Sequence, residues 1–109
     1  MVENGVKVFI GPQHISEHSD YELISMGPPI ILRHKKREFF TGRIPDLGLT
    51  VYGDTADSVV ERVKKAFFFY LRETRKLKGE DGVRDWLNYA EVRWEWAESS
   101  ESELVFTTS

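Results

Sequence analysis

The sequence predicts an α+β fold in which a long helix packs on one face of a single antiparallel sheet. Apolar residues alternate with a period of about two before residue 53, follow a period of about 3.6 after it, and alternate again from residue 91. The chain has 109 residues, of which 40% are hydrophobic, so it suits one domain. The expected order is β-β-β-α-(α)-β: an antiparallel meander, a helix, and a last strand that joins the sheet by a right-handed parallel crossover.

Residues 30–52 carry the three strands of the meander. β-rich runs at 30–33 and 39–44 flank a charged cluster, and this arrangement predicts a hairpin with a polar tip. A third run, at 49–52, lies between two glycine-containing turns. Strands joined by such short turns pair antiparallel.

The stretch after the third strand carries a broad apolar stripe at helical spacing. Thr55 suits the N-cap, although a strict capping box has Glu or Gln where this chain has Ser58. Gly79 follows the basic end of the stripe, as a helix C-cap does. Phe68 and Phe69 widen the stripe beyond what one sheet face requires, which indicates a second buried contact.

The expected domain covers residues 29–97 and closes with a short helix and a strand. The short helix is expected over 80–88, and the clean alternation at 91–96 predicts a half-buried strand. Residues 1–28 are expected to form an N-terminal arm or edge strand. The residues after 97 are expected to form an acidic tail, 98–109, ending in either a short strand or no structure.

The net charge of −3 conceals a strong asymmetry. Residues 1–30 hold one base and four acids, residues 31–78 hold twelve bases and six acids, and residues 79–109 hold two bases and eight acids. The chain therefore has a basic middle, with a net charge of +6, and an acidic end, with a net charge of −6. Such a dipolar surface favours a charged partner or self-pairing, and a simply solvated surface has the same pattern.

A compact motif joins the second strand, the third strand and the helix. Its members are Pro45, Asp46, Leu47, Gly48, Gly53, Asp54 and Thr55. The proline ends strand pairing, and Asp46 is expected to bond backbone amides in the turn. The two glycines allow positive φ or a close approach, and Thr55 caps the helix. These roles predict that the motif builds the fold rather than a ligand site.

This ordered motif, followed by a helix with Tyr70 and Leu71 near its expected end, resembles the HicB family, the antitoxin halves of HicA–HicB toxin–antitoxin pairs. The resemblance covers residues 30–97 and implies a partial RNase H-like β-β-β-α-β fold without RNase H catalysis. It also implies a homo-oligomer and a small basic RNA-cleaving toxin as partner. Many members carry a C-terminal DNA-binding segment, whereas residues 98–109 are short and acidic, so we expect a solitary HicB-like domain.

Two sets of charged residues are candidate binding sites. The partner-binding set, which would meet a basic toxin, consists of Glu91, Glu95, Glu98 and Glu101. The set that would contact nucleic-acid phosphates consists of Arg33, Lys35, Lys36 and Arg37. The sequence pI of about 5.6 argues against a dedicated nucleic-acid binder. A solvated hairpin tip that blunts a sheet edge is therefore the preferred interpretation of the second set.

The sequence offers no convergent catalytic set, so we expect no enzyme, no metal and no cofactor. It has no cysteine, which excludes disulfides, thiolate zinc sites and a cysteine nucleophile. His14, Glu17 and His18 have metal-ligand spacing if helical, but the neighbouring Pro12 favours a polar loop. The N-terminus lacks a signal-peptide layout and no apolar run has membrane-spanning length, so a cytoplasmic protein is expected.

Two functions from different classes follow from these features. The first is a HicB-like protein-binding module, an antitoxin-type protein that neutralises a small basic RNA-cleaving toxin and lacks a DNA-binding segment of its own. The alternative is an orphan, self-assembling domain with a structural or small-ligand role. It rests on the missing DNA-binding segment and on the aromatic residues, which make up 13% of the chain.

Overall fold

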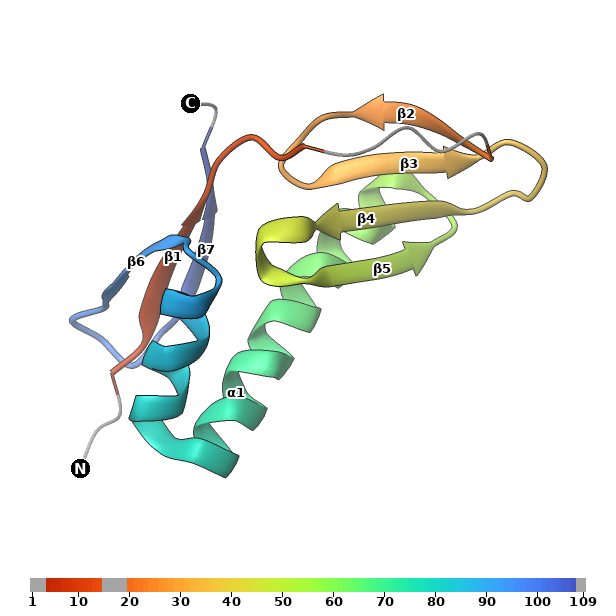
Figure 1. Ribbon diagram of the computed structural model, residues 1–109. Helices are drawn as coiled ribbons and strands as arrows, with labels where there is room; N and C mark the ends of the chain where they lie inside the picture. The colour runs from red at the N-terminus through yellow and green to blue at the C-terminus, as the bar shows by residue number, and fades with distance from the viewer. Residues whose placement is uncertain (1–3, 15–19, 108–109) are drawn as a thin grey trace.

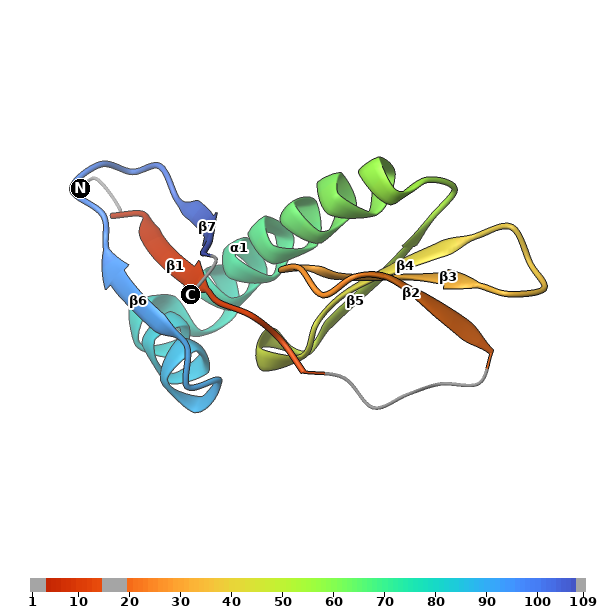
Figure 2. The ribbon, with the colours of Figure 1, turned by 90° about the horizontal axis from the view of Figure 1, so that it is seen from above.

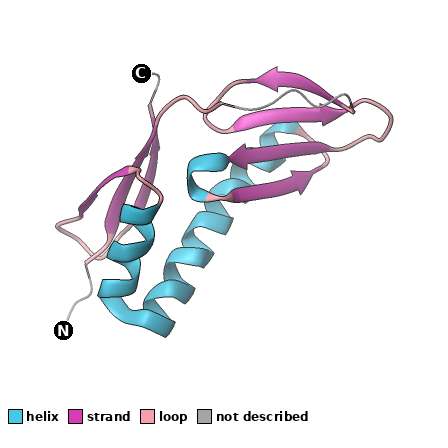
Figure 3. Ribbon diagram, in the orientation of Figure 1, coloured by secondary structure: helices cyan, strands magenta, loops and turns pink. Residues whose placement is uncertain are grey.

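The computed structural model describes residues 4–14 and 20–107 of the chain. These residues form two β-sheets and one long, kinked helix that packs against both of them (Figure 1). The predicted α+β class and the predicted packing of a long helix on a sheet face are confirmed. Figure 3 shows the strands in two groups, with the helix running from one group to the other.

The larger sheet is an antiparallel meander of four strands in sequence order. Its strands are β2 (Tyr21–Ser25), β3 (Ile30–His34), β4 (Phe40–Ile44) and β5 (Leu49–Gly53). At its centre Gly42 pairs with Ile31 on one side and with Val51 on the other. A Cβ on Gly42 would lie 3.2 Å from the side chains of Val59 and Val63, so glycine lets the helix approach the sheet closely. The predicted meander is confirmed, with β2 as an additional strand.

Helix α1 (Ala56–Tyr89) begins at a closed capping box. Thr55 Oγ1 accepts a hydrogen bond from the Ser58 backbone N–H at 3.0 Å, and Ser58 Oγ accepts one from the Thr55 N–H at 3.2 Å. The predicted N-cap is therefore confirmed, and Ser58 takes the place of the usual Glu or Gln. Its hydroxyl also donates to the Thr55 carbonyl oxygen at 2.9 Å, which keeps the short side chain turned toward the backbone.

Gly79 divides α1 into two arms. Its φ of 69° and ψ of −164° lie outside the helical region, and glycine adopts such angles without a Cβ clash. The first arm, residues 56–78, packs on β4 and β5, and the second arm, residues 80–89, folds back beside it (Figure 1). The predicted helix end at Gly79 and the predicted short helix after it are both confirmed.

The smaller sheet has the order β6–β1–β7. Its middle strand, β1 (Val6–Ile10), pairs antiparallel with β6 (Arg93–Trp96) and parallel with β7 (Glu103–Phe106). The prediction that the last strand joins the meander through a parallel crossover is therefore wrong. The fold-back at Gly79 returns the chain beside β1 rather than beside the meander, so β6 finds its partner there (Figure 2).

Both ends of the described chain take part in the two sheets. Residues 1–28 were expected to form an arm or edge strand, and within them β2 is an edge strand of the larger sheet, whereas β1 is the middle strand of the smaller one. Residues 98–109 were expected to form an acidic tail ending in a short strand or no structure, and the short strand is present as β7, Glu103–Phe106. The reason is apolar burial: alternate residues of β1 are fully buried, and Leu104 and Phe106 pack against the same core.

One hydrophobic core joins the two sheets and both helix arms. Its buried members are Val6, Val8, Ile10, Ile44, Leu47, Leu49, Val63, Phe67, Leu71, Val83 and Leu87. Within it the Phe67 ring lies 5.9 Å from the Trp86 ring, so the first arm contacts the second. In the described part of the chain, no helix combines the length and the apolar character needed to cross a bilayer.

Candidate functional site

The motif that runs from Pro45 to Thr55 begins with a single turn of 3-10 helix, Pro45–Leu47, between β4 and β5. Leu47 is buried in the common core. Gly48 ends the turn in the left-handed region at φ 68°, and its N–H donates to the Pro45 carbonyl oxygen at 3.0 Å. Pro45 therefore follows the last paired residue of β4, and Gly48 supplies the positive φ that the sequence predicts.

Asp46 has a partner that the sequence does not predict. Its Oδ2 accepts from Gln13 Nε2 at 2.8 Å, and its backbone N–H donates to Gln13 Oε1 at 3.1 Å. Gln13 is only 2% exposed. The expectation that Asp46 bonds amides of its own turn is corrected, because the Gln13 amide offers both a donor and an acceptor. This pair ties the segment after β1 to the turn between β4 and β5.

The second half of the motif brings β5 against the start of the helix. A Cβ on Gly53 would lie 2.4 Å from Ser58 Oγ, so this glycine serves a close approach rather than a positive φ. Asp54 is exposed beside the hairpin tip, and Thr55 is the N-cap described above. The motif residues thus shape the turn and the helix start.

The smaller sheet, β6–β1–β7, which we also call the second sheet, carries an acidic concavity of about 640 Å³ on its outer side. Three of the four predicted partner-binding residues, Glu95, Glu98 and Glu101, line it together with Glu103 and Lys7. The strand register explains part of this grouping, because Glu95 and Glu103 flank Lys7 across the three strands. We call these five residues the acidic surface.

The fourth predicted residue, Glu91, does not belong to the acidic surface. It lies in the turn between α1 and β6 with a left-handed φ of 57°, and its N–H donates to the Asn88 carbonyl oxygen at 3.1 Å. The alternation that suggested a shared face with Glu95 breaks here, since β6 begins only at Arg93. Sequence alternation alone does not reveal this turn.

Four carboxylates and one ammonium group give the acidic surface a local net charge of −3. All four glutamates are exposed. Two residues further along the same face, the paired residues are not acidic: Arg93 lies opposite Phe9, and its guanidinium stacks 4.4 Å from the centre of the Phe9 ring. The acidic character is therefore confined to one end of the sheet, where the β6–β7 connection adds its glutamates.

The four predicted nucleic-acid contacts, Arg33, Lys35, Lys36 and Arg37, surround a concavity of about 440 Å³ at the β3–β4 hairpin tip. Their charge is partly offset, because Arg33 is paired with Glu22 and two further acids line the same concavity. The tip is ordered by His34, whose Nδ1 accepts from the backbone N–H groups of Lys36 and Arg37 at 3.1 and 3.0 Å. These bonds use the tip amides that an anion would otherwise contact.

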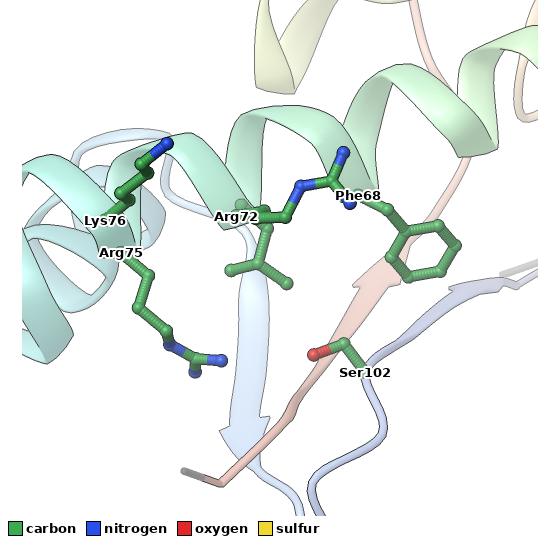
Figure 4. A pocket seen from close by; sticks show the side chains of 6 residues that line it. Phe68, Arg72, Arg75, Lys76 and Ser102 are labelled. Carbon is green, nitrogen blue, oxygen red and sulfur yellow. The ribbon is translucent and has the colours of Figure 1, made fainter.

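A third concavity, of about 450 Å³, lies beside the first helix arm and is lined by cations (Figure 4). Arg75 extends from the helix toward the second sheet and Lys76 points the other way. The Arg75 guanidinium is already engaged: it donates to the Asn4 carbonyl oxygen at 2.6 Å, and its Nε lies 2.7 Å from Glu80 Oε1. We therefore interpret this cluster as a structural link between helix and sheet.

A fourth surface, which the sequence indicates only through Phe69, is an apolar groove of about 640 Å³ between the two helix arms. Its apolar lining consists of Phe69, Tyr70, Leu77, Trp86 and Tyr89. Trp86 also packs against the common core, and the other four side chains are exposed.

The described residues contain no group of three His, Asp or Glu side chains placed to hold a metal ion. Of the three residues with metal-ligand spacing in the sequence, Glu17 and His18 lie outside the described ranges. His14 is exposed.

Comparisons with protein-family models, with curated proteins and with solved structures returned no match. The order β-β-β-α-β that the HicB resemblance implies runs along the chain as β3, β4, β5, α1 and β6. In this fold, however, β6 pairs with β1 outside the meander. The acidic surface and the apolar groove are thus the two features on which a functional interpretation rests.

Proposed function

We propose that the chain is a cytoplasmic protein-binding module that takes a basic protein partner on the acidic surface. The observation that carries the proposal is the convergence of Glu95, Glu98 and Glu101, with Glu103, around one concavity. A local net charge of −3 attracts a basic partner before contact and disfavours acidic ones.

A protein partner suits this surface better than a small ligand does. The glutamates are exposed and keep much of their hydration, so a single small cation gains little from any one of them. Several exposed carboxylates arranged over three strands and a loop instead give specificity and fast association to a partner that presents several cations at once.

Within this class we propose an antitoxin-type role, the neutralisation of a small basic RNA-cleaving toxin. The ordered motif shared with the HicB family supports this role, and it joins β4, β5 and α1 in this fold. A toxin that cleaves RNA needs cationic residues to hold the RNA phosphates. An acidic surface that occupies those residues would block RNA binding directly.

Co-expression with a small basic protein encoded next to this chain's gene tests the antitoxin role. We expect the neighbour alone to arrest growth, the pair to grow normally, and an affinity-tagged chain to retain the neighbour in a fixed ratio. The role is contradicted if no small basic protein is encoded there, or if the neighbour neither binds nor is neutralised.

A further inference from the structure

The groove between the helix arms exposes an unusual amount of apolar surface. Leu77 is 78% exposed and Tyr89 is 90% exposed, while Phe69 and Tyr70 are each 51% exposed. Exposed apolar patches of this kind mark interaction surfaces, and large aromatic side chains are the residues that contribute most at such interfaces. The half-buried Trp86 forms part of the same lining.

The groove is built from two helical stripes that face the same space. On the first arm the lining positions 70, 73, 74 and 77 follow the spacing i, i+3, i+4, i+7, and on the second arm positions 82, 85, 86 and 89 repeat it. Each arm therefore turns one continuous stripe toward the groove. A groove between two helices accommodates a further helix by interdigitation of side chains.

The charges at the groove show what kind of partner fits. Glu73 and Asp85 contribute two carboxylates, and Lys78 contributes one ammonium group. None of the three forms an ion pair within the described residues. The groove therefore offers both positive and negative side chains, and its net charge is close to zero. Such a surface is complementary in charge to a second copy of itself rather than to a strongly basic or strongly acidic partner.

We propose that the groove is the interface of a two-fold dimer, in which a second copy of the chain packs its own two arms against it. A two-fold axis sets Lys78 of each copy against Glu73 and Asp85 of the other, so each attractive contact occurs twice. The exposed Leu77 and Tyr89 of each copy then enter the hollow of the other. The groove shares no residue with the acidic surface, so this proposal is independent of the proposed function.

Analytical ultracentrifugation of the full chain over a range of concentrations tests the dimer. The wild-type chain should approach twice the 12.7 kDa of the monomer. Lys78→Glu and the double variant Glu73→Lys/Asp85→Lys should each raise the dissociation constant by about tenfold or more, because each sets like charges against one another twice. Lys65→Glu makes the same charge change as the first variant at an exposed position outside the groove, and should leave dimerisation unchanged.

An equimolar mixture of the two charge variants gives the decisive result. In the mixed dimer both contacts become attractive again, so dimerisation should recover to within a few-fold of wild type. A wild-type chain that stays monomeric up to about 1 mM would overturn the proposal. So would a mixture that associates no more tightly than either variant alone, or a dimer that is insensitive to Tyr89→Ser, because these results place the partner on another face.

Discussion

The two sheets are assembled from the chain in different ways. The four-stranded meander uses one continuous segment, residues 21–53, with short turns between its strands. The three-stranded sheet instead brings β1, near one end of the chain, between β6 and β7 from the other end, so that Val6 lies opposite Trp96. Closing so long a loop costs conformational entropy. The second sheet, which carries the acidic surface, therefore depends on the core that it shares with the helix.

A matched pair of core truncations should have the largest effect on stability. Ile10 and Ile44 each end a strand, one in each sheet, and both are fully buried in the common core. We expect Ile10→Ala and Ile44→Ala each to lower the free energy of unfolding by about 2–5 kcal/mol. Because the core is shared, each variant should unfold in one transition.

The three tryptophans make this comparison measurable, because all of them lie in the second arm or in β6. Fluorescence therefore follows the second sheet and its surroundings, whereas circular dichroism follows mainly α1. The two signals should give one midpoint in urea for each variant. An Ile10→Ala variant whose fluorescence midpoint falls while its dichroism midpoint stays would show that the second sheet unfolds separately.

The link between Gln13 and Asp46 should have the next largest effect, because it joins the two regions directly. Asp46→Ala removes the acceptor of the 2.8 Å bond, so the buried Gln13 amide nitrogen keeps only its longer bonds to the carbonyl oxygens of Gly11 and Pro12. We expect a loss of about 1–2 kcal/mol in urea unfolding. Asp46→Asn retains an oxygen acceptor and should recover most of that loss. Equal destabilisation by the two substitutions would contradict the claim that the side-chain bond to Gln13 is the source of the loss.

Removing the helix cap should have the smallest of these effects on stability, because the cap joins residues only three positions apart at the start of α1. Thr55→Ala removes the side-chain acceptor for the Ser58 N–H, at a cost of about 1 kcal/mol. Thr55→Ser keeps a hydroxyl at the same place and serves as the matched control. Thermal unfolding should rank wild type and serine together above alanine, and an alanine variant as stable as the serine variant would contradict the capping assignment.

The features that could be predicted from the sequence are local ones. The cap at Thr55, the helix end at Gly79 and the hairpin between β3 and β4 each depend on residues a few positions apart. The alternation at 91–96 likewise indicated a strand. It did not indicate the partner of that strand, because side-chain alternation shows which residues face the core but not which neighbour pairs with the backbone.

The features that escaped prediction depend on contacts across the chain. The pair of Gln13 and Asp46 could not be predicted, because the two residues are 33 positions apart and a single glutamine belongs to no periodic pattern. Three acids were placed correctly near one another because β6 and the loop after it are close in sequence. Glu91 was not, because its left-handed φ of 57° interrupts the alternation. The apolar groove was indicated only by the excess width of the helical stripe at Phe69.

The dissociation constant of the chain for the proposed partner, a small basic protein encoded next to its gene, tests the central claim most directly. It should be measured for wild type, for Glu95→Lys/Glu98→Lys, and for Glu38→Lys/Glu61→Lys, which makes the same charge change at exposed positions outside the acidic surface. We predict that the first double variant weakens binding by about a hundredfold and that the control weakens it by less than about threefold at physiological salt. Equal weakening by the two variants would contradict the claim that the acidic surface is the binding site.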